Sequence, residues 1–156
     1  RDYLKDAVAA IHLSQAQGTF PLVERDASAY ALWGSTYKTP RTWFNQIVKN
    51  WLNQKVAGQV PIIFRGTYLV PGDTECEIRG RASPESGDPS GLNVHFGTSK
   101  TALIHIQAIT QDQFEAGVEI TGLTNGLKYY FQVRPTVQIA HQGSWSGIYY
   151  STPVEP

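Results

Sequence analysis

Residues Gly97–Thr136 read GTSKTALIHIQAITQDQFEAGVEITGLTNGLKYYFQVRPT, and apolar and polar side chains alternate through most of this segment. A period of two residues places successive side chains on opposite faces of a strand, so the pattern is typical of an antiparallel sheet buried on one face. Similar shorter runs lie on both sides of the segment, separated by glycine, proline and serine. Seven short strands within about 95 residues favour a β-sandwich.

The predicted strands occupy most of the chain after Val60. They lie within residues 61–70, 74–82, 92–96, 101–110, 113–123, 128–139 and 148–154. In the second of them, one predicted face carries Thr74, Cys76, Ile78 and Gly80, and the other carries Glu75, Glu77, Arg79 and Arg81. In the fourth, Ala102, Ile104, Ile106 and Ala108 share one face.

The amino-terminal third has the 3.6-residue period of helices instead. One helix is predicted over residues 2–17, between a cap at Asp2 and a left-handed stop at Gly18, and a short helical turn over residues 26–34. A longer helix is predicted from a cap at Thr39 to a stop at Gly58, with a proline at its first position. Its apolar stripe, which requires a cover, consists of Trp43, Phe44, Ile47, Val48, Trp51, Leu52 and Val56. The predicted fold is therefore α+β, with a helical anchor or packing segment at residues 1–58 and a β-sandwich at residues 60–156.

Three segments of the β half resemble a fibronectin type III domain. They are VHFGTS (residues 94–99), GLTNGLKYYFQVRP (122–135) and GSWSGIYYSTP (143–153). The resemblance covers about residues 60–154 and implies a seven-stranded antiparallel sandwich. It also implies that Tyr129 is a corner tyrosine, whose hydroxyl bonds to the chain near Leu123.

One departure from that family lies on the second predicted strand. The family usually has a tryptophan where this chain has Gly80, and an unfilled space of that size costs several kcal/mol. We expect a large side chain from the helical segment to fill it, either Trp33 or an aromatic residue of the Trp43–Trp51 helix. The helical segment would then belong to the same folded unit.

Histidines and serines are the first candidates for chemistry. A tight turn near Ser99–Lys100 would set His95 and His105 roughly opposite each other, but a metal site needs further ligands, and none is evident. We therefore interpret both as solvated surface residues and expect no metal or cofactor. Ser144 and Ser146 lack a histidine–acid pair, although His141 lies nearby. Their segment is interpreted as a structural loop in which Trp145 caps the sandwich, or alternatively as a recognition loop.

Charged side chains on the second predicted strand offer no acid pair for glycoside cleavage. Glu75 and Glu77 alternate with Arg79 and Arg81 on a wet face, which favours cross-strand ion pairs. Cys76 faces inward and is interpreted as a small core residue. As the only cysteine, it excludes an internal disulfide.

Exposed aromatic side chains are the main candidates for binding. Tyr130 has the outward parity of its strand, and either Tyr149 or Tyr150 must also face outward. These rings either stack on a ligand or stabilise the sheet by cross-strand pairing. The candidate interaction surface comprises Trp43, Phe44, Ile47, Trp51, Tyr130, Trp145 and Tyr149.

Composition limits the classes of partner. The 156 residues include 13 basic and 13 acidic side chains, so the formal net charge is zero. We expect neither nucleic acid as a partner nor membrane insertion, because charge is unclustered and no apolar run reaches about 18 residues. The absence of methionine favours a processed chain or a piece of a longer polypeptide.

The first functional interpretation is a non-enzymatic structural or adhesive module of a larger extracellular or virion-surface assembly. The resemblance ranks a bacteriophage tail or capsid-surface component first, because fibronectin-like sandwiches are common there. Its partners would be copies of itself, other subunits or a cell-surface glycan. The alternative is a carbohydrate-binding accessory domain of a secreted bacterial hydrolase, acting through Tyr130, Tyr149 or Trp145. A third interpretation is an enzyme whose site the sequence does not reveal.

Overall fold

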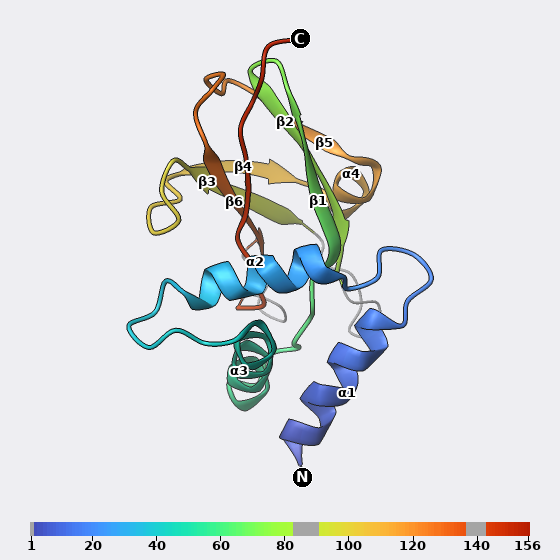
Figure 1. Ribbon diagram of the computed structural model, residues 1–156. Helices are drawn as coiled ribbons and strands as arrows, with labels where there is room; N and C mark the ends of the chain where they lie inside the picture. Colours follow the sequence, from blue (N-terminus) through green and yellow to red (C-terminus); the bar gives the residue numbers. More distant parts are fainter. Residues whose placement is uncertain (1, 83–90, 137–142) are drawn as a thin grey trace.

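The computed structural model describes residues 2–82, 91–136 and 143–156, and the protein is α+β as expected. Within these residues lie four helices and seven strands, and the strands form two antiparallel sheets. Figure 1 shows three helices gathered at one end of the sheets, with the carboxyl terminus at the opposite end. The two parts are called here the helical segment (residues 2–58) and the two-sheet region (residues 62–136 and 143–156).

The helical segment contains α1 (Tyr3–Gln15), α2 (Glu24–Gly34) and α3 (Trp43–Val56). Asp2 caps α1 as predicted, since its carboxylate accepts a hydrogen bond from the backbone N–H of Lys5 at 3.1 Å. The predicted left-handed stop at Gly18 is wrong, because the φ of Gly18 is not positive. The predicted stop of α3, Gly58, does have a positive φ, of 79°.

The predicted start of α3 is also wrong, by one turn. The cap is Thr42, whose hydroxyl accepts from the backbone N–H of Asn45 at 3.2 Å. Thr39 and Pro40 lie before the helix and are exposed. Two threonines at a spacing of three residues offer the same capping group, and the one adjacent to the apolar run is used.

All strands except β3 are shorter than the sequence predicts. They are β1 (Arg65–Gly72), β2 (Glu75–Arg81), β3 (Leu92–Gly97), β4 (His105–Ile109), β5 (Val118–Ile120), β6 (Tyr129–Pro135) and β7 (Tyr149–Ser151). One sheet has the order β1-β2-β5 and the other has the order β4-β3-β6-β7. The alternation predicted for β2 is confirmed, since Cys76, Ile78 and Gly80 are buried and the charged residues between them are half-buried.

The predicted strand over residues 113–123 is wrong in its first half, which forms the helix α4 (Gln111–Ala116). Thr110 and Gln113 cap each other's backbone N–H groups, with distances of 3.1 and 2.9 Å, and this reciprocal pair starts a helix. Gly117, with a φ of 96°, ends the helix and turns the chain into β5. The alternating pattern concealed these capping signals.

The face of β4 that carries apolar side chains points to solvent. Ile104 and Ile106 are 74% and 60% exposed, whereas Ile109 at the end of the strand is buried. β4 is the edge strand of its sheet, and neither Ile104 nor Ile106 belongs to a hydrophobic core of the described residues.

Two hydrophobic cores organise the protein. The first lies between the two sheets and includes Cys76 and Ile78 from β2 and Phe131 and Val133 from β6. The second is shared between the helical segment and the end of the two-sheet region. Its buried members are Ala7, Ile11, Leu22, Tyr30, Trp33, Ile47, Val48, Ile63 and Ile148. The three long helices therefore pack against one another and against that end of the sheets (Figure 1).

The expectation that Trp33 or an α3 aromatic fills the space beside Gly80 is wrong. A Cβ at Gly80 would lie 2.7 Å from the ring of Phe114 and 2.4 Å from the hydroxyl of Thr67. Phe114 comes from α4 and is fully buried in the first core. The space is filled from within the two-sheet region, and Trp33 lies in the second core instead.

The ring of Tyr129 is buried in the first core at the start of β6. Its hydroxyl accepts a hydrogen bond from the backbone N–H of Thr124 at 2.9 Å, one residue beyond Leu123. The contact fixes the turn between β5 and β6.

Candidate recognition site

A buried carboxylate anchors α2 to the two-sheet region. Asp26 accepts hydrogen bonds from the backbone N–H groups of Gly66 at 2.8 Å and Thr67 at 3.0 Å, and from the hydroxyl of Tyr149. It also accepts from the N–H of Val23, at the start of its own helix. Burial raises the pKa of Asp26, and these four hydrogen bonds oppose that effect. The N-terminal half of α2 is thus fixed to β1 and β7.

Further contacts fix the middle of α2. The hydroxyl of Tyr30 accepts from the backbone N–H of Phe64 at 3.2 Å, and burial raises the pKa of this phenol. The N–H of Ile148 donates to the carbonyl of Ala29 at 2.9 Å. Gly147 permits this approach, because a Cβ there would lie 2.4 Å from the backbone of Ala29. The position of the C-terminal end of α2 over the sheet follows from these anchors.

At that end lies a hollow of about 430 Å³, which we call the junction hollow. α2 and the residues after it contribute Trp33 and Tyr37, the loop between β3 and β4 contributes Lys100, and β6 contributes Arg134. Trp145, from the segment before β7, completes the aromatic part of the wall.

Arg134 is held by neighbours on several sides. Its Nε and Nη2 donate to Oε1 of Gln132 at 3.1 and 2.8 Å, and its Nη1 lies 3.4 Å from Nδ1 of His95. The guanidinium carbon lies 3.7 Å from the ring centre of Trp145, and Trp145 in turn stacks on Trp33 with centroids 5.9 Å apart. Burial lowers the pKa of Arg134. It also lowers the pKa of His95 to about 4, with the nearby guanidinium adding to the effect.

Lys100 approaches the same hollow from the β3–β4 loop. Its Nζ donates to the hydroxyl of Ser35 at 2.9 Å, directly after α2 ends, where the partial negative charge of the helix C-terminus favours a cation. The Ser35 hydroxyl in turn donates to the carbonyl of Leu32 at 2.6 Å.

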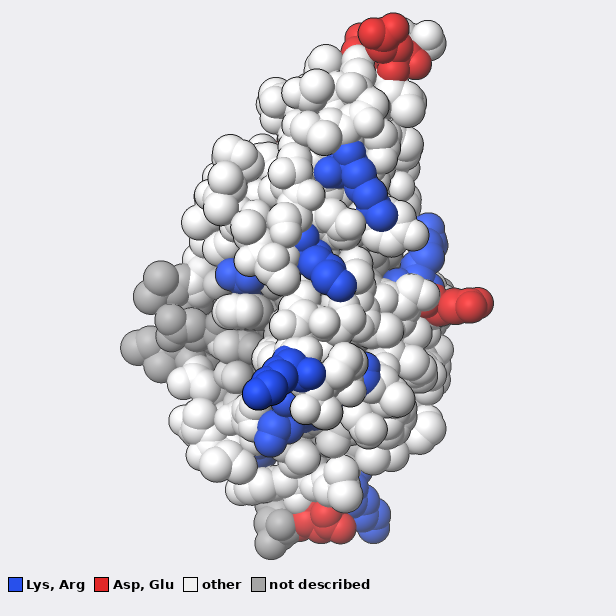
Figure 2. Space-filling view, turned by 60° about the vertical axis from the view of Figure 1, so that its left-hand side comes forward, with Lys and Arg blue, Asp and Glu red and all other residues white. Residues whose placement is uncertain are grey.

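The described residues that line the junction hollow include two cations and no carboxylate. Figure 2 brings forward the side of the protein on which the end of α2 and the β3–β4 loop lie in Figure 1. Lysine and arginine side chains are spread over this face, whereas aspartate and glutamate appear toward the edges of the view (Figure 2). The hollow is therefore suited to an anionic ligand.

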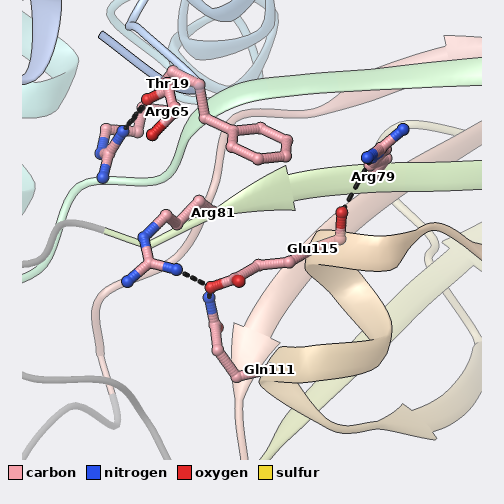
Figure 3. A network of polar contacts seen from close by, with 7 residues as sticks. Thr19, Arg65, Arg79, Arg81, Gln111 and Glu115 are labelled. Atoms are coloured by element: carbon pink, nitrogen blue, oxygen red, sulfur yellow. Dashed lines mark hydrogen bonds and ion pairs between the residues drawn. The ribbon is translucent and has the colours of Figure 1, made fainter. Parts of the chain in front are cut away.

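A second group of arginines, on the β1-β2-β5 sheet, contacts the side chain of Glu115 and backbone carbonyl groups. Figure 3 shows Arg81 in an ion pair with Glu115, while Nε of Arg79 donates to the backbone carbonyl of Glu115 at 2.8 Å. Gln111 donates to the same carboxylate at 3.1 Å. Arg65 is buried and donates to the carbonyl of Thr19 at 2.6 Å, so this network joins α4, the sheet and the segment before α2.

The predicted cross-strand ion pairs of Arg79 and Arg81 are wrong, because Arg81 pairs with Glu115 of α4 and Arg79 donates to the backbone carbonyl of the same residue. The sequence missed it because the segment that forms α4 was assigned to a strand. Glu75 instead shares a hydrogen bond with Glu119, which raises the pKa of Glu75.

The two histidines do not face each other. In the register of β3 and β4, Phe96 lies opposite His105 and Ile106 lies opposite His95. His105 packs against the ring of Phe96, with ring centres 5.2 Å apart, while His95 faces Arg134 on the other side of the sheet. The prediction that His95 lies opposite His105 is therefore wrong, by one residue in the register of the two strands.

The described part of the chain contains no cluster of three or more histidine, cysteine, aspartate or glutamate side chains suited to a metal.

Ser144 and Ser146 are buried and serve the backbone. Their hydroxyls accept from the N–H groups of Ile62 at 3.1 Å and Val133 at 2.8 Å. These contacts agree with the interpretation of this segment as a structural loop. His141, the nearby histidine, lies outside the described residues. Cys76 is a buried core residue as predicted, and burial raises the pKa of its thiol.

The residues of the predicted interaction surface do not form one continuous surface, because α3 and β6 place them in different parts of the protein. Trp43, Phe44 and Trp51 are half-buried against the second core, and Ile47 is fully part of it. Tyr130 is half-buried on the outer face of β6.

The prediction that Tyr149 belongs to an exposed interaction surface is wrong, because its ring is buried and its hydroxyl donates to Asp26. The outward tyrosine of β7 is Tyr150, which is 60% exposed. The ammonium of Lys128 lies 4.0 Å from its ring centre.

Of the residues that form the junction hollow, sequence reasoning singled out only Trp145 as a candidate for binding. Arg134 and Lys100 carry no local signal, because each is a single cation in an alternating or turn segment. The sequence shows no acidic residue near position 134, but this absence does not indicate that Arg134 contacts His95 and Trp145.

Fold and geometry together define an α+β protein of two antiparallel sheets with a cationic, aromatic-lined hollow where the helical segment meets the sheets. No protein-family model matches the sequence, and a search of curated proteins finds no match. Among the described residues, no helix combines the length and apolar character needed to cross a membrane.

Proposed function

We propose that this protein is a non-enzymatic adhesive module that attaches to its partner through the junction hollow. One observation carries the proposal: Arg134 and Lys100 line the same hollow, and neither has a carboxylate partner among the described residues. Cations held at fixed positions without counter-charges favour binding of an anionic group, because the ordering cost has been met in folding.

The surroundings of the candidate nucleophiles support a binding role over catalysis. Ser144 and Ser146 are engaged by backbone N–H groups, and the two histidines lie on different sides of their sheet. A nucleophile needs an adjacent base and access to substrate.

A place in a larger extracellular or virion-surface assembly, with a bacteriophage tail or capsid-surface component first, is part of the proposal. It rests on the resemblance to fibronectin type III domains. The strand orders β1-β2-β5 and β4-β3-β6-β7 and the hydroxyl contact of Tyr129 support that kinship. In such an assembly, the exposed apolar face of β4 and the half-buried aromatics of α3 are available for contacts with other subunits.

The alternative is an accessory domain that stacks sugars on the rings of Tyr130, Tyr149 or Trp145, and the positions of two of these rings give it less support. Tyr149 is buried, and Trp145 is packed against both Arg134 and Trp33. The charged hollow supports recognition by ion pairing over recognition by stacking.

A ligand array that presents acidic and neutral glycans together with acidic and neutral peptides tests the adhesive function. We expect the wild-type chain to be retained on an acidic class, and the double variant Lys100→Gln, Arg134→Lys to lose retention. The variant Lys128→Gln, which removes a cation outside the hollow, should be retained like the wild type. Retention on no class, or equal retention of the double variant, would refute the proposal. Light scattering on the free chain would separately test the assembly, since an oligomer is expected for an assembly subunit and a monomer for an accessory domain.

A further inference from the structure

We propose that the junction hollow binds a carboxylate-bearing sugar unit, with the carboxylate on the guanidinium edge of Arg134 and Lys100 as the second cation. This inference rests on the adhesive function proposed above and names its ligand class.

The donor groups of Arg134 define where a carboxylate would bind. A guanidinium has five N–H groups, and the contacts with Gln132 and His95 use three of them, so two remain. The side formed by Nε and Nη2 is occupied by Gln132. The remaining donors lie on Nη1 and Nη2, and a carboxylate binds such a pair with two parallel hydrogen bonds.

The guanidinium is held in one orientation before any ligand arrives. Gln132 is buried, and its Nε2 donates to the carbonyl of Ser146 at 2.7 Å, so its oxygen is directed toward Arg134. The guanidinium carbon also lies over the ring of Trp145, 3.7 Å from its centre. Burial without a carboxylate partner among the described residues disfavours this charge, as the lowered pKa of Arg134 indicates. A bound anion would relieve that cost.

The rest of the hollow favours a sugar ring over the side chain of an acidic peptide. At about 430 Å³ it exceeds what one carboxylate side chain fills and lies in the range of small-molecule sites. Leu103 and Ile148 offer an apolar wall for the C–H face of a ring. The hydroxyl of Thr36 donates to the carbonyl of Trp33 at 2.7 Å, which leaves its oxygen to accept from a sugar hydroxyl. Thr101 adds a second hydroxyl at the rim.

Titrations followed by two-dimensional NMR of the full chain test the assignment, with the indole N–H signals of Trp33 and Trp145 as local probes. The probes are glucuronate and N-acetylneuraminate, with methyl glucoside, acetate, inorganic phosphate and a short glutamate peptide as comparisons. We expect the two acidic sugars to shift both indole signals in a saturable manner. The comparison ligands should bind at least about tenfold more weakly.

Variants then assign the roles. Arg134→Lys keeps the charge but loses the paired donors, and we expect about a tenfold loss of affinity for the acidic sugars. Lys100→Gln should lose about three- to tenfold, and Lys128→Gln should stay within about twofold of the wild type. If Arg134→Lys fails to fold, Lys100→Gln and the indole shifts of the wild type still decide the question.

Several outcomes would overturn the assignment. Equal binding of acetate or phosphate would show a general anion site, and equal binding of methyl glucoside would remove the role of the carboxylate. Tighter binding of the glutamate peptide would assign the hollow to a protein partner. Binding of acetate, phosphate or the glutamate peptide is compatible with retention on an acidic class of the array, so the sugar assignment can fail while the adhesive function stands. Equal binding of methyl glucoside would count against both.

Discussion

Tyr149 donates its phenolic hydrogen to the buried carboxylate of Asp26, and this contact joins residues 123 positions apart in the sequence. The same carboxylate accepts the backbone N–H groups of Gly66 and Thr67, so one side chain of α2 holds both β1 and β7. A short helix thereby becomes part of the two-sheet fold, and the hollow at its other end has a fixed shape.

We expect Asp26→Asn to lower the free energy of unfolding by about 2–4 kcal/mol, because an amide cannot accept from all of these donors and leaves some unsatisfied. Urea unfolding followed by tryptophan fluorescence and far-ultraviolet circular dichroism should show one coincident transition for both parts of the chain. Glu24→Gln, an exposed carboxylate of the same helix, is the control and should change the free energy by less than about 0.5 kcal/mol. Separate transitions for helices and sheets would contradict the role of Asp26.

Removal of the hydroxyl of Tyr129 should destabilise the turn between β5 and β6. The N–H of Thr124 loses its acceptor in Tyr129→Phe, and we expect a loss of about 1–2 kcal/mol in urea unfolding. Tyr150→Phe removes a hydroxyl from an exposed ring on the neighbouring strand, opposite Tyr130, and should be close to neutral. Equal losses in both variants would show that the contact with Thr124 contributes little.

Steric crowding should make Gly80→Ala destabilising by about 1–3 kcal/mol, because the new methyl group meets Thr67 and Phe114 at distances below 3 Å. Phe114→Leu in the same chain provides space, so the double variant should be more stable than the sum of the two single changes implies. Gly18→Ala is the matched control, since no atom lies within 4 Å of its Cβ. Additive effects in the double-variant cycle would argue against Phe114 as the residue that fills this space.

His95 should make the protein lose stability as the pH falls. Its folded-state pKa of about 4 lies below the usual value of 6.5, so the unfolded chain binds the proton more tightly. The stabilisation from neutral His95 is complete above pH 6.5 and is lost as the pH falls toward 4. The full shift corresponds to about 3 kcal/mol, and partial exposure to solvent reduces the expected loss to about 1 kcal/mol.

The measurement for His95 is urea unfolding at several pH values for the wild type and His95→Gln. The two curves should diverge between pH 6.5 and 4, with the wild type losing more stability. An NMR titration of the His95 ring in Arg134→Gln should show a pKa that rises but stays below 6.5, because burial is the larger cause. Parallel stability curves, or an ordinary His95 pKa in the wild type, would contradict this prediction.

Local patterns predicted the class of fold but not its details. The two-residue period correctly indicated an antiparallel β region, and the burial of Cys76 and Ile78 followed from it. The same pattern concealed α4, because a helix of six residues is too short for its period to show and its capping pair lies within an alternating run. Periodicity also assigns residues to faces without saying which face is inside, as the exposed Ile104 and Ile106 demonstrate.

By itself the sequence determined the change from a helical segment to a β region and the alternation of β2, because each depends on residues close together in the chain, while the resemblance to fibronectin type III domains implied the hydroxyl contact of Tyr129 near Leu123. Only the tertiary structure decided that Phe114 fills the space at Gly80 and that Tyr149 faces inward to Asp26. It alone brought Lys100 to Ser35, 65 residues away, and so created a hollow with Arg134 in its wall. Such meetings depend on how whole layers pack and on which buried donors find an acceptor, and no local period encodes that choice.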